Sequence, residues 1–229
     1  MPSLRTAHPI ERWSLVNAIG MLGATAGAVW LEQTGPLLVG GVGLLAVLVG
    51  VARDRWTPAG DFGAANAVTA LRVGLLCSLP YAASVGPTVL IGLSTLILAT
   101  DGVDGWLARR TEQSSTFGAF FDKETDALFL LVLCGLAAFR GRLPLWILGA
   151  GLLRYGFVLL LFLPISTETT ESRFNLARYV YGGMIAALLF SFLPYPALAH
   201  TLVVLAMTAL IFSFGRSAWD LLSSQDSSG

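Results

Sequence analysis

Long apolar runs follow one another along most of the chain, and they limit its fold more than any other feature. They lie at about 13–31, 37–52, 65–83, 88–109, 118–139, 143–163, 174–193 and 196–214. A helix of about 20 apolar residues crosses the hydrocarbon core of a bilayer. Charged residues make up only 12% of the chain, against about 25% in an ordinary soluble domain. We therefore expect an all-α polytopic membrane protein, a helical bundle of about eight transmembrane helices.

The first apolar run follows a polar, positively charged start, which is also typical of a secretory signal peptide. The run is long enough to span, however, and its end, VWLEQTG, lacks a small-residue cleavage site. An uncleaved transmembrane helix is therefore the preferred interpretation.

The distribution of arginines predicts the orientation of the bundle, because Lys and Arg are enriched in cytoplasmic loops. With both termini inside, the arginines near the inner side are Arg5, Arg12, Arg53, Arg55, Arg109, Arg110, Arg173, Arg178 and Arg216. Only Arg140 and Arg142 lie clearly outside. The 14 basic residues balance the 14 acidic ones, and no basic patch with interleaved aromatics suggests a nucleic-acid partner.

Four carboxylates gather in the stretch DGVDGWLARRTEQSSTFGAFFDKETD, and they belong to Asp101, Asp104, Asp122 and Asp126. Helical periodicity puts the first two on one face with Gly105 and Ala108, and the second two on one face with Gly118. A carboxylate in the hydrocarbon region costs roughly 2.5–3.5 kcal/mol. Four close together also repel one another, so positive charge must neutralise them. Hard divalent cations, which prefer oxygen ligands, are the natural solution.

The same stretch carries a sequence signature, D-x2-D-G-x2-A-R-x8-G-x3-D-x3-D. Its positions are filled, without departure, by Asp101, Asp104, Gly105, Ala108, Arg109, Gly118, Asp122 and Asp126. Eight fixed residue types coincide by chance with a probability on the order of 10⁻¹⁰ per start position. On this motif the chain resembles the CDP-alcohol phosphotransferase family over roughly residues 61–214.

The resemblance implies a six-helix family core and a division of the chain into three parts. Residues 56–216 would form the core, residues 1–55 an N-terminal two-helix addition without an assigned role, and residues 217–229 a polar tail. It further implies a homodimer in a bacterial-type cytoplasmic membrane. The arginine distribution predicts that the acidic cluster faces the cytosol.

The resemblance also implies roles for the motif residues. Asp101, Asp104 and Asp122 would hold two metal ions, Mg²⁺ or Mn²⁺, with Asp126 shared. Asp126 is also the family's proposed general base and Asp122 a catalytic partner, although the residues alone do not separate ligand from base. Gly105, Ala108, Arg109 and Gly118 would form the nucleotide side, where small residues leave room for cytidine and Arg109 offers its fork to phosphate.

Residues outside this motif are weaker candidates. Asn66, Thr69 and Arg72 resemble an N-x-x-T-x-x-R pattern at the start of the family's first core helix; the alternative is a helix N-cap and a snorkelling arginine. Arg154, inside an apolar run, needs a partner, either the acceptor's phosphate or an acid of the cluster.

Three further charged positions have two interpretations each. Arg173 and Arg178 either bind a phosphorylated acceptor or act as inside-positive anchors. Glu124, with Lys123, points away from the Asp122 face, and we expect an interfacial charge or a local ion pair there.

The function that this pattern predicts is transfer of a substituted phosphate from a CDP-linked donor to an alcohol, with release of CMP. CDP-diacylglycerol is the favoured donor, and its acceptor would be a small polar alcohol. The alternatives are transfer of a CDP-linked head group to diacylglycerol, a divalent-cation transporter that uses the four aspartates, and an inactive scaffold. The outer halves of the runs carry few acids, which argues against transport.

Overall fold

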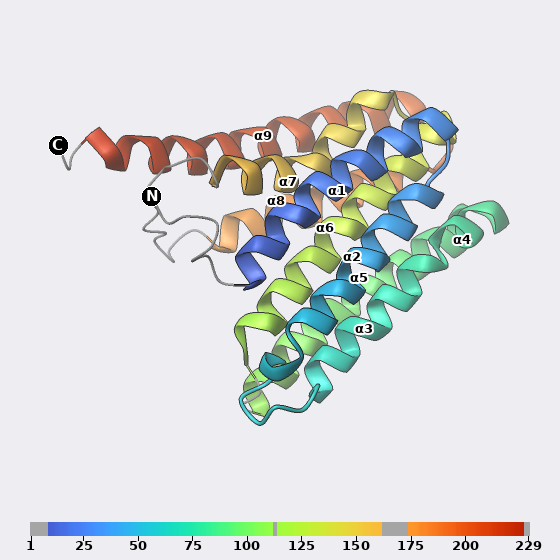
Figure 1. The fold of residues 1–229 in the computed structure, drawn as a ribbon. Helices are drawn as coiled ribbons and strands as arrows, with labels where there is room; N and C mark the ends of the chain where they lie inside the picture. Colours follow the sequence, from blue (N-terminus) through green and yellow to red (C-terminus); the bar gives the residue numbers. More distant parts are fainter. Residues whose placement is uncertain (1–8, 112–113, 162–173, 227–229) are drawn as a thin grey trace.

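The computed structural model describes residues 9–111, 114–161 and 174–226, and all regular structure in these ranges is helical (Figure 1). The helices are α1 (Pro9–Leu31), α2 (Gly35–Val51), α3 (Ala64–Cys77), α4 (Leu79–Val85), α5 (Pro87–Arg110), α6 (Thr116–Phe139), α7 (Leu148–Leu161), α8 (Phe174–Phe190) and α9 (Pro196–Asp226). Short 3₁₀ turns lie at Arg53–Arg55 and Leu145–Ile147. Each predicted apolar run is thus largely helical.

The third run differs from its predicted form, because it consists of two helices, α3 and α4, that meet at an angle of 44°. Pro80 lies at the start of α4 and explains the break. Proline has no N–H to donate, and its ring clashes with the carbonyl oxygen four residues earlier in a continuous helix.

The number of membrane crossings is supported in part. Within the described ranges, the helical segments Arg12–Leu31 and Pro196–Arg216 are long and apolar enough to cross a bilayer, and the bent pair α3–α4 gives a third. Other helices, including α2 and most of α5, are apolar but shorter. The structure therefore agrees with a helical membrane protein and leaves the expected eight spans unconfirmed.

Helix α6 is the centre of the bundle, and its residues from Ala127 to Ala137 are all buried. It packs against α2, α3, α7 and α8. Glycines allow the closest of these approaches: a Cβ on Gly151 of α7 would lie 2.6 Å from the Leu131 backbone, and one on Gly41 of α2 would clash with Leu128. The position of α6 in the bundle is thus closely constrained by the helices packed against it.

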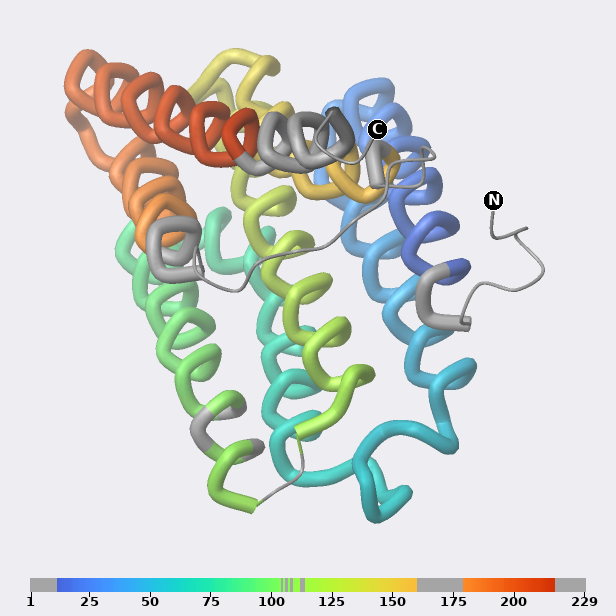
Figure 2. The backbone as a smooth tube through the Cα atoms, turned by 90° about the vertical axis from the view of Figure 1, so that its left-hand side faces the viewer, coloured from blue at the N-terminus to red at the C-terminus, as the bar shows by residue number. Residues whose placement is uncertain are grey.

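The N-terminal helices are part of this packing. Helix α1 pairs with α2 and lies against α7, while α2 lies against α6, so the two cover one side of the central helix (Figure 1). Helix α9 pairs with α8 and crosses the long helices obliquely (Figure 2).

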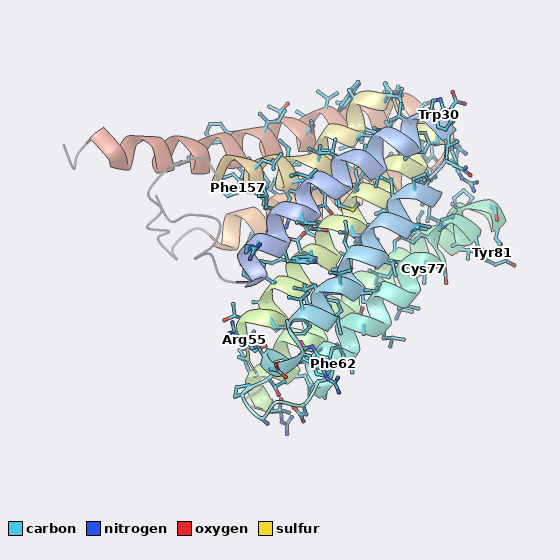
Figure 3. The ribbon with its side chains drawn as sticks, in the orientation of Figure 1. Trp30, Arg55, Phe62, Cys77, Tyr81 and Phe157 are labelled. Atoms are coloured by element: carbon cyan, nitrogen blue, oxygen red, sulfur yellow. The ribbon has the colours of Figure 1, made fainter. Side chains whose placement is uncertain are left out.

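The connection between α2 and α3 lies with Arg55 and Phe62 at one end of the bundle, whereas Trp30 and Tyr81 lie at the other (Figure 3). Trp56 packs in this connection. Its ring meets Phe62 edge-on at 5.0 Å between centroids, and its indole N–H donates to the carbonyl oxygen of Val49. The connection is therefore held rigidly beneath the start of α6.

Candidate active site

Three helices bring their charged residues together near one end of the bundle. Asp101 of α5 and Asp122 and Asp126 of α6 each offer a carboxylate oxygen, and these oxygens lie within 4.8 Å of one another. Arg72 of α3 reaches into the group. Its Nη1 lies 2.6 Å from Asp101 Oδ1 and 3.3 Å from Asp126 Oδ1, and its Nη2 binds Asp122.

Arg72 supplies positive charge to the acidic cluster from within the protein. Its side chain is only 1% exposed, so it does not snorkel to an interface as the alternative interpretation predicted. The N-x-x-T-x-x-R pattern made Arg72 a candidate, but it did not predict the contact with the aspartates. The available signal was an arginine inside an apolar run, which is stable there only beside acidic partners.

The other two residues of the α3 pattern are also buried, on the side of α3 that faces α6. Asn66 is not the N-cap that was predicted, because Gly63 takes that position with a positive φ of 74°. Instead the Asn66 amide donates to the carbonyl oxygens of Phe62 and Trp56, at 2.7 and 3.1 Å. Thr69 donates to the carbonyl oxygen of Ala65. Asn66 thus fixes the α2–α3 connection to the start of α3.

The first turn of α6 is attached to the same connection through Ser115. As N-cap, its hydroxyl accepts a hydrogen bond from the Gly118 N–H and donates to the carbonyl oxygen of Trp56. A side chain at Gly118 would place its Cβ 2.9 Å from Asn66 Oδ1, so glycine is what lets α3 and α6 approach here.

A pocket of about 170 Å³ opens beside the carboxylates, between α3, the end of α5 and the start of α6. Its lining includes six predicted site residues: Asn66, Thr69, Gly105, Arg109, Gly118 and Asp122. The Arg109 guanidinium lies over Gly105, where a Cβ would be 3.5 Å from Nη1. Gly105 and Gly118 therefore border open space that also adjoins the Arg109 guanidinium and the Asp122 carboxylate.

Tyr181 of α8 adds a fourth helix to the site, and sequence reasoning missed it. Its hydroxyl donates to the backbone carbonyl oxygen of Asp126 at 3.0 Å. A tyrosine whose ring is partly buried usually finds such an acceptor for its hydroxyl.

Four predicted site positions fall wholly or partly outside what the structure describes. Asp104 and Ala108 lie in α5, and Arg178 lies in α8, but their side chains are outside the described part. Arg173 lies outside the described residues altogether.

Arg154 lies on the opposite side of α6 from the carboxylate cluster. It forms an ion pair with Glu124, which also accepts a hydrogen bond of 2.8 Å from the Asn17 amide. Glu124 is 2% exposed, so the expectation of an interfacial charge is wrong. It does form an ion pair, but with Arg154 from another helix. The need of Arg154 for a partner was the signal for this pair.

The donor set of the carboxylate cluster fits a hard divalent ion. Mg²⁺ and Mn²⁺ prefer oxygen ligands, and carboxylates from two different helices converge here. Arg72 contacts Oδ1 of each of the three aspartates. The side chains are 25–37% exposed, and Asp122 also lines the pocket.

Comparison with known proteins agrees with this chemistry. The family model for CDP-alcohol phosphatidyltransferase matches residues 62–218. A CDP-diacylglycerol–glycerol-3-phosphate 3-phosphatidyltransferase of Pseudomonas fluorescens is 59% identical over 34 residues, which are 15% of this chain and 17% of that protein. No solved structure matches. Because the family model covers well over half of the chain and includes the converging carboxylates, this protein belongs to the CDP-alcohol phosphatidyltransferase family.

Proposed function

We propose that this enzyme transfers a phosphatidyl group from CDP-diacylglycerol to a small polar alcohol and releases CMP. The observation that carries the proposal is the convergence of carboxylates from α5 and α6 within 4.8 Å, beside a pocket lined by Gly105, Arg109 and Gly118. The name of the Pseudomonas fluorescens relative supports phosphatidyl transfer.

In the proposed reaction the acceptor's hydroxyl oxygen attacks the phosphorus of the phosphatidyl group. The bond from this phosphorus to the oxygen of the CMP moiety breaks, and CMP leaves with the electron pair. Asp126 takes the proton of the attacking hydroxyl as general base. Asp101, Asp104 and Asp122 would hold divalent ions, with Asp126 shared, and such ions, when bound, offset the charge on the diphosphate.

The remaining pocket residues orient the donor. Arg109 offers two parallel N–H donors to a phosphate, which fix its direction as well as its position. Gly105 leaves space beside α5 for cytidine, and Asn66 and Thr69 line the pocket on the α3 side. By the family resemblance, Ala108 is proposed to lie on the nucleotide side as well. Arg72 keeps the three carboxylates close together and offsets part of their mutual repulsion.

The setting of the reaction is also part of the proposal. We place the carboxylates at the cytosolic side of a bacterial-type inner membrane, since the arginine distribution favours that orientation. Arg173 and Arg178 are proposed to face a phosphorylated acceptor, and a homodimer is proposed from the family resemblance. Since Arg154 is bound to Glu124, we no longer assign it to an acceptor phosphate.

Substitution of the α6 aspartates tests the proposal. Asp122→Asn and Asp126→Asn remove charge with little change in size, and each should lower CMP release from CDP-diacylglycerol by at least about 100-fold, a typical contribution of a general base. EDTA should stop the wild-type reaction, and added Mn²⁺ or Mg²⁺ should restore it.

Asp54→Asn is a matched control, because Asp54 is exposed in the 3₁₀ turn after α2. It should leave turnover near that of the wild type. Turnover at wild-type rates in both α6 variants would remove the catalytic assignment. Product mass from a panel of alcohols, including glycerol phosphate, inositol derivatives, serine and diacylglycerol, identifies the acceptor and separates the two transfer modes.

A further inference from the structure

Glu124 occupies a special position between the two α6 aspartates. It is two residues from each, so it points about 200° around the helix from Asp122 and from Asp126. The aspartates face α3 and α5, where Arg72 and Asp101 meet them. Glu124 faces the other way and is buried at 2% exposure.

Two helices outside the carboxylate cluster bind Glu124. Its Oε2 accepts the 2.8 Å hydrogen bond from Asn17 of α1, itself only 3% exposed, and its Oε1 pairs with Arg154 of α7. Charge-assisted hydrogen bonds to a buried carboxylate are directional, and leaving that carboxylate without partners in an apolar environment is costly. These bonds therefore favour one rotational setting of α6.

Packing along α6 strengthens this constraint. Gly151 of α7 approaches the backbone of Leu131, and a Cβ on Gly135 of α6 would lie 3.0 Å from Leu37 and Thr34. The helices that provide Asn17 and Arg154 are thus the ones that lie close against α6, directly or through α2. The polar contacts of Glu124 favour one rotation of α6 about its axis, and the close packing limits movement of the helix away from that rotation.

A small rotation of α6 has a large effect on the reaction geometry. A carboxylate about 5–6 Å from a helix axis moves by about 1 Å when the helix turns by about 10°. A misplacement of about 1 Å costs about 100-fold in rate when reacting groups must be aligned. The carboxylate cluster depends on the setting of α6, because two of its three described acids come from that helix.

We propose that Glu124 is a positioning residue, through which Asn17 of α1 and Arg154 of α7 fix the rotational setting of α6 and thereby the placement of Asp122 and Asp126. The N-terminal helix α1, which lies outside the residues matched by the family model, thus takes part in organising the active site. This inference rests on the proposed function, in which the two aspartates bind metal and carry out catalysis.

The test uses the full chain in detergent and measures Mn²⁺ affinity, kcat and KM separately. Glu124→Gln should weaken Mn²⁺ binding, followed by the electron paramagnetic resonance signal of free Mn²⁺, by about 10- to 100-fold, as loss of supporting contacts does at metal sites. Its kcat for CMP release should fall by about 100-fold. The KM for CDP-diacylglycerol should change little, because Glu124 does not line the pocket.

Two further variants separate positioning from stability. In Glu124→Leu/Arg154→Leu the apolar pair should restore the unfolding temperature, since such replacements of buried ion pairs are often neutral. If Glu124 is a positioning residue, the kcat and the Mn²⁺ affinity of this double variant should stay low. Asn17→Leu removes no charge and remains testable if Glu124→Gln does not fold; its kcat should fall by about tenfold, the effect of roughly one lost hydrogen bond.

Glu32→Gln in the exposed turn between α1 and α2 is the matched control and should behave as the wild type. Wild-type Mn²⁺ affinity and kcat in the folded Glu124→Gln and Asn17→Leu variants would overturn the inference and leave the proposed function intact. So would full recovery of activity in the leucine pair. A wild-type protein that binds Mn²⁺ without releasing CMP would overturn the proposed function instead, while the affinity comparison would still test the role of Glu124.

Discussion

Replacement of Arg72 by methionine isolates the charge that the protein itself supplies to the carboxylate cluster. Methionine is similar in length and stays apolar, so the variant removes the guanidinium with little change in packing. The three aspartates that contact Arg72 then face one another without this counter-charge. We expect the variant to be less stable than the wild type when divalent ions are removed.

The size of the effect follows from the contact geometry. Unit charges about 4 Å apart interact by about 4 kcal/mol at an effective dielectric constant of about 20. The aspartates are 25–37% exposed, so water screens part of this interaction. We therefore expect a loss of about 2–4 kcal/mol in the free energy of unfolding, below the full cost of breaking a wholly buried pair. For a chain of this size that lowers Tm by about 5–15 °C.

Divalent ions should stabilise the Arg72→Met variant. An ion that binds the folded state at about 100 times its Kd stabilises that state by about 2.7 kcal/mol. Without the competing positive charge of Arg72, the carboxylates should bind Mn²⁺ more tightly. The rise in Tm between EDTA and Mn²⁺ should therefore be larger in Arg72→Met than in the wild type.

Thermal unfolding in detergent, with EDTA and with MnCl₂, measures both effects. Arg72→Lys keeps a positive charge, so its Tm should lie between the Tm of Arg72→Met and that of the wild type. Arg53→Met removes an exposed arginine at the end of α2 and is the control for loss of positive charge alone. Equal Tm values for Arg72→Met and the wild type in EDTA would refute the electrostatic reasoning, because the aspartates would then not need the arginine.

Two further predictions concern the glycines that let helices approach α6. Gly151→Ala places a methyl group 2.6 Å from the Leu131 backbone and should cost about 1–3 kcal/mol in thermal or denaturant unfolding, whereas Gly156→Ala in the same helix meets nothing within 4 Å and should be neutral or stabilising. Equal free energies of unfolding for Gly151→Ala and Gly156→Ala would show that α7 does not pack closely against α6 at Gly151. Gly118→Ala must displace Asn66 Oδ1 and narrow the pocket, so we expect the KM for CDP-diacylglycerol to rise by about tenfold, as for roughly 1.4 kcal/mol of lost binding; an unchanged KM would place the donor elsewhere.

Much of the active site could be predicted because it depends on local periodicity. Asp122 and Asp126 are four residues apart, and any helix puts such a pair on one face. Their pairing with α5 follows from the short connection between the two helices. The pocket residues Gly105, Arg109 and Gly118 are part of the same signature, so their grouping was predicted together with the acids.

The partners of the charged residues could not be predicted in the same way. Glu124 lies 107 residues from Asn17 and 30 from Arg154, and no periodicity links such positions. The bend between α3 and α4 was signalled by Pro80 but overlooked within a continuous apolar run. Asn66 suits a helix start by residue type, yet its amide binds carbonyl groups of the preceding connection instead.

By itself, the sequence determined that the chain is helical, that its helices are apolar, and which carboxylates and small residues share a helix face, because these depend on composition and on the 3.6-residue turn. Only the tertiary structure decided which charges neutralise one another: Arg72 pairs with the α6 aspartates, and Arg154 with Glu124. The physical reason is that a charge removed from water must find a partner, and that partner is set by the packing of distant helices rather than by neighbours in the chain.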